Sequence, residues 1–181
     1  MKQYVFGYGS LVDPAEIALT LGHATNIVYP VYLNGYTRDW SVVVDNLAMP
    51  RRFKVTSTGL EPKLVVALNV YKSNKPTNPN GIIFEVTDND LKQMDIRESH
   101  YERIDVTADI TGAPDGIVYT YSGLTHHILS ADETAITDII LPGSYMDVVE
   151  KGFAALGEDM LAEYRASTVV SAVPVFESIL Q

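Results

Sequence analysis

The chain contains no cysteine among its 181 residues. It can therefore form no disulfide bond and carry out no thiol chemistry. Positive charge is also scarce, because 13 Lys and Arg stand against 23 Asp and Glu and leave a net charge of −10. This balance excludes nucleic acid or an anionic membrane surface as the main partner. A small anionic substrate remains compatible, since backbone amides can bind an anion locally.

Long apolar runs are absent as well. No stretch is long enough to span a bilayer, and the first residues, Met1-Lys2-Gln3-Tyr4, lack the apolar core of a signal peptide. We therefore expect a cytoplasmic protein. The sequence also lacks internal repeats, low-complexity tracts and any dividing linker, so residues 1–181 are expected to form a single domain.

The most informative segment is the opening one, in which an apolar strand enters a loop with Gly7 and Gly9 and a helix leaves it. Glycine permits conformations that a Cβ would block and lets a ligand approach the main chain. Asp13, Pro14 and Glu16 supply a capping residue, a favourable first helical residue and the acid of a capping box. The loop therefore offers free amides beside a helix N-terminus, which suits a carboxylate or an oxyanion. A tight turn without a ligand would have the same pattern.

The rest of the sequence predicts five to seven strands and about three helices that do not alternate strictly. This mixture predicts an α+β fold, with a mixed, partly closed β-sheet or barrel and a few helices at its ends and on one face. Residues 45–62 are expected to form a long loop, Asn80-Gly81 a turn, and the apolar tail 168–180 a segment that packs on the body or on a second subunit. Strands are expected at 4–8, 29–44 (two strands with a turn at Asn34-Gly35), 63–71, 82–86, 101–110 and 117–121, and helices at 14–21, from 88 to 97 or 98, at 145–156 and, briefly, at 159–164.

Glu98 is the candidate acid–base residue. It stands where the helix that begins at Asp88 should end, and the negative end of a helix dipole favours a protonated carboxyl. Partial burial would raise its pKa further, into the range useful for moving protons near neutral pH. The alternative is a solvated surface residue, because Arg97-Glu98-Ser99-His100 is a charged run.

Three motifs together resemble the gamma-glutamylcyclotransferase-like family. Residues Tyr8-Gly9-Ser10-Leu11 are similar to its opening Tyr-Gly-Ser-Leu loop, and residues 95–106 are similar to its essential Glu, here Glu98, followed by a Tyr and a strand. Residues Pro142-Gly143-Ser144-Tyr145 are similar to an element that leads into a Gly-containing helix. Each motif is weak alone, but together they span residues 4–164 in the order and at the separations of that fold.

The resemblance implies a reaction in which the α-amine of a γ-glutamyl compound attacks its own γ-carbonyl. The products are 5-oxoproline and the released amine or amino acid. By this resemblance Glu98 moves the protons, the amides of Tyr8, Gly9, Ser10 and Leu11 bind the α-carboxylate or the oxyanion, and Tyr145 helps to place the substrate. The partner is then a small γ-glutamyl molecule, and no metal or organic cofactor is needed. A homodimer is compatible with this reading.

Other readings remain open at this stage. The same pocket could belong to a non-catalytic protein that binds a glutamyl-like ligand or a protein partner, or to an enzyme that removes a γ-glutamyl group from a biosynthetic product. Tyr145 could simply pack on the core, and Tyr101 is expected to be structural. Residues 12–14, Val-Asp-Pro, lack the Ile-Trp of the glutathione-degrading branch, so glutathione is not the expected substrate. Arg51, Arg52 and Lys54 could meet a carboxylate but are expected to be solvated.

Overall fold

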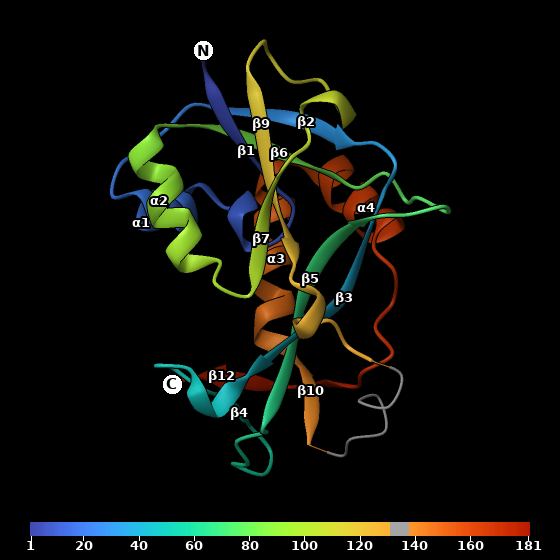
Figure 1. Cartoon of the computed structure of the whole chain (residues 1–181). Coiled ribbons are helices and arrows are strands. Elements are labelled where there is room, and N and C mark those ends of the chain that lie inside the picture. The colour runs from blue at the N-terminus through green and yellow to red at the C-terminus, as the bar shows by residue number, and fades with distance from the viewer. Residues whose placement is uncertain (131–137) are drawn as a thin grey trace.

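The computed structural model describes residues 1–130 and 138–181. This part of the chain is an α+β fold in which a curled sheet, forming half of a barrel, is accompanied by four helices (Figure 1). The predicted fold class is therefore confirmed. No helix within these two ranges is long and apolar enough to cross a membrane.

Strand β1 (Gln3–Gly7) is one of the two central strands of the larger sheet. It pairs antiparallel with β6 (Asn80–Val86) and parallel with β9 (Ile117–Gly123), and its residues from Tyr4 to Gly7 are all buried. Burial on both faces explains the apolar run in this strand. The six strands in spatial order are β7 (Tyr101–Asp105), β9 (Ile117–Gly123), β1 (Gln3–Gly7), β6 (Asn80–Val86), β2 (Ile27–Leu33) and β8 (Ile110–Thr111).

The smaller sheet is built on a long antiparallel pair and meets the larger sheet along one seam. Ser122 in β9 donates its hydroxyl to the Val70 carbonyl at 2.7 Å, and Tyr101 in β7 donates to the Leu68 carbonyl at 2.8 Å. These bonds join the two sheets beside the site. The strands in spatial order are β11 (Val175–Phe176), β10 (Ile139–Pro142), β5 (Leu64–Lys72) and β3 (Tyr36–Asp45), and a separate pair joins β12 (Ser178–Leu180) to β4 (Phe53–Val55).

The helices flank the sheets and end at the site. At the start of α2 (Asp88–Arg97) the Thr87 side chain caps the first turn, and the Asp90 carboxylate accepts a hydrogen bond from the Thr87 amide at 2.8 Å, which completes a capping box. Glu98 follows the last turn of this helix and donates its amide to the Met94 carbonyl. The four helices are α1 (Pro14–Leu21) and α2 (Asp88–Arg97), on one side of Figure 1, and α3 (Gly143–Leu156) and α4 (Glu158–Ser167).

The start of α1 differs from its prediction in one detail. The helix spans the predicted residues, and Asp13 accepts a hydrogen bond from the Ala15 amide at 2.8 Å. The predicted capping box with Glu16 is wrong, however, because the Asp13 amide donates to the Ser10 carbonyl at 3.2 Å instead. The Asp13 amide is thus used to end a short 3₁₀ turn over Ser10–Val12 and is not available to the Glu16 side chain.

Two strand boundaries were predicted wrongly. Asn80-Gly81 forms no turn but begins β6. Position 81 is glycine for another reason: a Cβ there would lie 2.3 Å from the Gly7 carbonyl oxygen, so only glycine allows this approach of β6 to β1. The strand predicted over 101–110 stops at Asp105, whose carboxylate accepts from the Thr107 amide at 2.9 Å and starts a 3₁₀ turn.

The segment predicted as a long loop is partly ordered into secondary structure. Its residues 53–55 form β4, and the tail supplies the partner strand β12, with Val55 opposite Ser178. The tail also adds β11 beside β10, so it packs on the body of the same chain. The predicted turn at Asn34-Gly35 is confirmed, but β2 and β3, which it joins, enter different sheets.

Arg38 is fully buried and connects the loop after β1 to the rest of the fold. Its guanidinium donates to the carbonyls of Tyr8 at 3.2 Å, Asn80 at 2.8 Å and Tyr164 at 3.1 Å. It also lies 4.5 Å from the centre of the Tyr164 ring. Among the described residues no carboxylate forms an ion pair with it, so neutral oxygens and aromatic rings hold this charge.

Replacing this side chain should therefore be costly. We predict that Arg38→Leu lowers the free energy of unfolding by about 3 kcal/mol or more, because several buried carbonyls lose their donors. Urea denaturation measures the loss. The matched control is Arg165→Leu, which removes only an exposed pair with Glu150 and should cost far less. Equal losses in the two variants would show that Arg38 does not hold the loop.

Candidate active site

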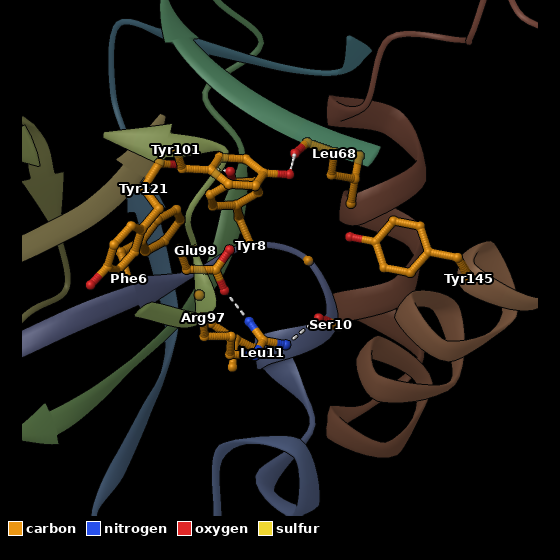
Figure 2. Close-up of a pocket in the computed structure, with 12 residues that line it drawn as sticks. Phe6, Tyr8, Ser10, Leu11, Leu68, Arg97, Glu98, Tyr101, Tyr121 and Tyr145 are labelled. Carbon is orange, nitrogen blue, oxygen red and sulfur yellow. Dashed lines mark hydrogen bonds and ion pairs between the residues drawn. The ribbon is translucent and has the colours of Figure 1, made fainter. Parts of the chain in front are cut away.

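One hollow lies where the loop after β1, the end of α2, strand β5 and helix α3 meet. Its volume is about 370 Å³, including the mouth that opens to solvent. Figure 2 shows Glu98 near its centre, with Arg97 and Ser10 on one side and the Tyr145 hydroxyl directed inward from α3. The lining residues are Phe6, Gly7, Tyr8, Gly9, Ser10, Leu11, Leu68, Arg97, Glu98, Tyr101, Tyr121 and Tyr145.

The loop presents main-chain groups to this hollow. The Val12 amide donates to the Gly9 carbonyl at 3.1 Å and closes the 3₁₀ turn. Apart from bonds inside helices and strands, the described residues offer no acceptor to the amides of Gly9 and Ser10. The Leu11 side chain is buried in the core, and the Tyr8 hydroxyl donates to the Tyr121 carbonyl at 2.7 Å. The loop thus contributes backbone and the Ser10 hydroxyl rather than its larger side chains.

The two loop glycines serve different purposes. A Cβ on Gly7 would lie 2.6 Å from the Leu11 carbonyl oxygen, so the turn folds back too closely for any other residue. Gly9 has a φ of −129°, and a Cβ there would meet Leu68 and Tyr145 at an ordinary 3.5 Å. The turn geometry therefore requires glycine at position 7, whereas Gly9 leaves open the space in front of Tyr145.

Glu98 lies on the wall of the hollow rather than in bulk solvent. Its side chain is 13% exposed. Burial raises the pKa of this carboxyl above its ordinary value of 4.5, while the Arg97 guanidinium and His100 pull the pKa back down. The Arg97 guanidinium donates directly to the Glu98 carboxylate. A carboxyl with these opposing influences is suited to exchanging a proton with a ligand.

Tyrosine hydroxyls surround the carboxyl. Burial is the largest cause of the raised pKa of Tyr145, which is about 12, and Glu98 adds to it. The pKa values of Tyr8 and Tyr101 are raised for the same first reason. These hydroxyls therefore stay protonated near neutral pH. Those of Tyr8 and Tyr101 already donate to the carbonyls of Tyr121 and Leu68, whereas the Tyr145 hydroxyl can donate to a ligand. The ring of Trp40 meets Tyr145 edge-on at 5.8 Å and fixes its position.

Sequence reasoning missed several residues of the hollow, among them Arg97, Tyr101 and Leu68. Arg97 was grouped with a solvated run, Tyr101 was expected to be only structural, and Leu68 was not singled out. Arg97 could have been recognised as a site residue, because it directly precedes Glu98 at the end of a helix. The other two come from the seam between β7 and β5, which only the tertiary structure brings together.

Several residues considered from the sequence lie elsewhere. Arg51 donates to the Leu180 carbonyl at 3.2 Å and Arg52 pairs with Glu61, both beside the β4–β12 pair and outside the hollow. The rings of His126 and His127, which also lie outside the hollow, are tilted by 44° with their centres 4.3 Å apart. Within residues 1–130 and 138–181, no group of His, Asp and Glu side chains is arranged to hold a metal ion.

No protein-family model matches the chain, and neither does any curated protein sequence. Solved structures do match. A gamma-glutamyl cyclotransferase aligns over 92% of this chain and 88% of its own, with a TM-score of 0.61 and 13% identity. The chain has the gamma-glutamyl cyclotransferase fold. The resemblance found in the sequence is thereby confirmed at the level of the fold.

Other structures with this fold carry different descriptions. YkqA from Bacillus subtilis aligns over 91% of this chain and 53% of its own, with a TM-score of 0.60 and 16% identity. A cyclotransferase from yeast described as specific to glutathione aligns over 92% and 95%, with a TM-score of 0.51 and 12% identity. At these identities the likeness establishes the fold, and the chemistry has to be argued from the site.

The contrast between the two loop glycines can be tested. We predict that Gly7→Ala lowers the free energy of unfolding by about 1–3 kcal/mol, because the new Cβ must displace backbone. Gly9→Ala should cost clearly less, because its Cβ meets side chains at an ordinary distance. Urea denaturation compares the two variants. A larger loss for Gly9→Ala would contradict this account of the turn.

Proposed function

We propose that the protein is a gamma-glutamylcyclotransferase-type enzyme, which closes the γ-glutamyl group of an amine or amino acid to 5-oxoproline. One observation carries the proposal. Glu98 and residues 8–11 line the same hollow, although some ninety positions separate them. A ligand in the hollow can thus meet a proton carrier and anion-binding groups together.

The reaction needs little beyond positioning and proton transfer. The α-nitrogen of the substrate attacks its γ-carbonyl carbon, and a new C–N bond forms a five-membered ring. The old C–N bond to the leaving amine then breaks. Glu98 takes a proton from the α-ammonium and delivers it to the leaving nitrogen, so the carboxylate is regenerated. The ring nitrogen loses a second proton as the lactam forms, and the released amine takes it up and departs as an ammonium. Because both reacting groups belong to one molecule, holding the chain curled supplies much of the rate enhancement.

The remaining groups stabilise charge. In this mechanism the amides of Gly9 and Ser10 bind the α-carboxylate or the oxyanion formed at the γ-carbon. The protonated Tyr145 hydroxyl can donate a hydrogen bond to the same region. This mechanism uses no metal or organic cofactor.

The leaving group is either an amine or an amino acid. Removal of a γ-glutamyl group from a biosynthetic product is the same reaction with a different leaving amine. The decisive experiment incubates the purified protein with a panel of γ-glutamyl amines and γ-glutamyl dipeptides and measures 5-oxoproline by mass spectrometry. Release from at least one compound supports the enzyme, whereas binding without release supports the non-catalytic alternative.

Glu98 is the residue to change first. We predict that Glu98→Gln lowers the rate of 5-oxoproline release by roughly 10²–10⁴-fold, because the amide cannot carry the proton. The matched control is Glu102→Gln, which changes an exposed residue of β7 and should leave the rate unchanged. Undiminished turnover in Glu98→Gln would remove this residue from the mechanism.

The same substitution should leave the fold intact. A carboxyl whose folded-state pKa is raised stabilises the fold below its unfolded pKa, and this contribution is lost as pH rises through the raised value. Ionised Glu98 is therefore unfavourable for stability at neutral pH. Glu98→Gln is consequently expected to unfold no more easily than the wild type at pH 7, which thermal denaturation checks.

The pH dependence of the rate follows from the burial of Glu98. Because only its ionised form accepts the substrate proton, kcat/KM should fall on the acid side of a midpoint that lies above 4.5, the ordinary pKa of this group. Initial rates measured across the acid range locate the midpoint. A rate that is still undiminished at pH 4.5 would show that the catalytic base is not a carboxyl with a raised pKa.

A further inference from the structure

Arg97 lines the hollow but has no role in the proposed proton transfers. It extends from the last residue of α2 into the hollow, where its guanidinium donates to the Glu98 carboxylate and to the Ser10 hydroxyl at 3.3 Å (Figure 2). Its side chain is 31% exposed. Arg97 and Glu98 are the two charged residues among those that line the hollow. The free site therefore holds one positive and one negative group, paired with each other.

A γ-glutamyl group carries the complementary pair of charges. Its α-carbon bears an ammonium and a carboxylate, which lie next to each other in any conformation. When Glu98 accepts the ammonium, Arg97 loses its partner, and a partly buried cation without a partner is unfavourable. A carboxylate delivered by the same ligand would restore the balance.

We propose that Arg97 binds the α-carboxylate of the substrate, together with Ser10 and the loop amides, by exchanging its ion pair with Glu98 for one with the ligand. This inference rests on the proposed function and deepens it, because it assigns the charged α-amino-acid head of the substrate to two residues that are adjacent in the sequence. The planar guanidinium suits a carboxylate, which it can contact through two N–H groups.

The position of Ser10 supports this orientation. The Ser10 hydroxyl belongs to the loop and already accepts a hydrogen bond from the Arg97 guanidinium. A carboxylate at that point would therefore contact both the guanidinium and the loop. The exchange also has a chemical consequence, because Arg97 holds the pKa of Glu98 down in the free protein. Once Arg97 turns to the ligand, Glu98 becomes a stronger base at the moment when it must accept a proton.

The test compares two ligands that differ only in the α-carboxylate. γ-Glutamyl methylamide carries it, and 4-amino-N-methylbutanamide lacks it but can cyclise in the same way. For the wild type and for Arg97→Gln, we would measure the KM of the first compound and the competitive inhibition constant of the second. We expect the KM to rise roughly 10- to 100-fold in the variant, and the inhibition constant to change less than about 3-fold.

The second ligand separates two roles of Arg97. Any effect of the substitution on Glu98 acts on both compounds, because both present an amine to that carboxylate. Only an effect on carboxylate binding acts on the first alone. Arg97→Lys is the conservative variant and should recover part of the loss, because it keeps the charge without the planar geometry. A similar loss for both ligands, or for neither, would overturn the proposal.

A third compound excludes a different placement. In a γ-glutamyl amino acid a second carboxylate lies on the leaving group. If Arg97→Gln weakens this compound and leaves the methylamide unaffected, Arg97 recognises the leaving group and the proposal is wrong.

The role of Arg97 can also be tested if the protein proves not to be an enzyme. If the wild type releases no 5-oxoproline, calorimetric titration of the same two ligands replaces the kinetic measurement. Binding of γ-glutamyl methylamide that Arg97→Gln weakens selectively would then establish the head-binding site in a non-catalytic protein. Absence of binding to the wild type would overturn the assignment of Arg97 as well.

Discussion

The arrangement of the site depends on a positive charge that is buried without a negative one beside it. Among the described residues, Arg38 is held by carbonyl and hydroxyl oxygens from the loop, β6 and the end of α4, and by the faces of two aromatic rings. Each bond is directional, so the guanidinium fixes the Tyr8 carbonyl relative to the helices. A carboxylate partner would neutralise the charge but would not require these separate elements to converge.

The hollow beside it follows a different electrostatic principle. There the opposite charges of Arg97 and Glu98 are adjacent, half sheltered from water, and paired with each other until a ligand arrives. Tyrosine hydroxyls with raised pKa values complete the surroundings and remain neutral, and among them the Tyr145 hydroxyl can donate to a ligand. A site of this kind favours ligands that carry both charges, because they replace the internal pair without leaving either residue unpartnered.

What the sequence predicted well was local. Asp13 and Pro14 mark the start of α1, Thr87 marks the start of α2, and Asn34-Gly35 marks a turn, because caps and turns depend on residues a few positions apart. Local signals of this kind could not predict that the loop and Glu98 lie close together, and this proximity was proposed only from resemblance to a family. The structure brings both to one hollow, while the roles of Glu98, Tyr145 and the loop amides stay predictions.

The errors have a common physical origin. Gly81 resembles a turn residue, yet it is glycine because β6 must approach β1 closely, which no local pattern reveals. Tyr101 resembles an ordinary strand residue, yet its hydroxyl reaches Leu68 in another sheet. Arg97 resembles part of a solvated run until the loop after β1 is placed beside it. In each case the deciding contact is made by a residue far away in the sequence.

The strand pair at the opposite end of the molecule has a consequence for the order of assembly. Strand β4 finds its partner in β12, and the neighbouring Arg51 bonds a carbonyl 129 positions further along the chain. On a ribosome this corner cannot acquire its backbone partners until residues 178–180 have emerged, whereas β1 and β6 can pair much earlier. Strand β12 therefore completes this corner late, and chains that stop short of it would leave the edge of β4 exposed to association.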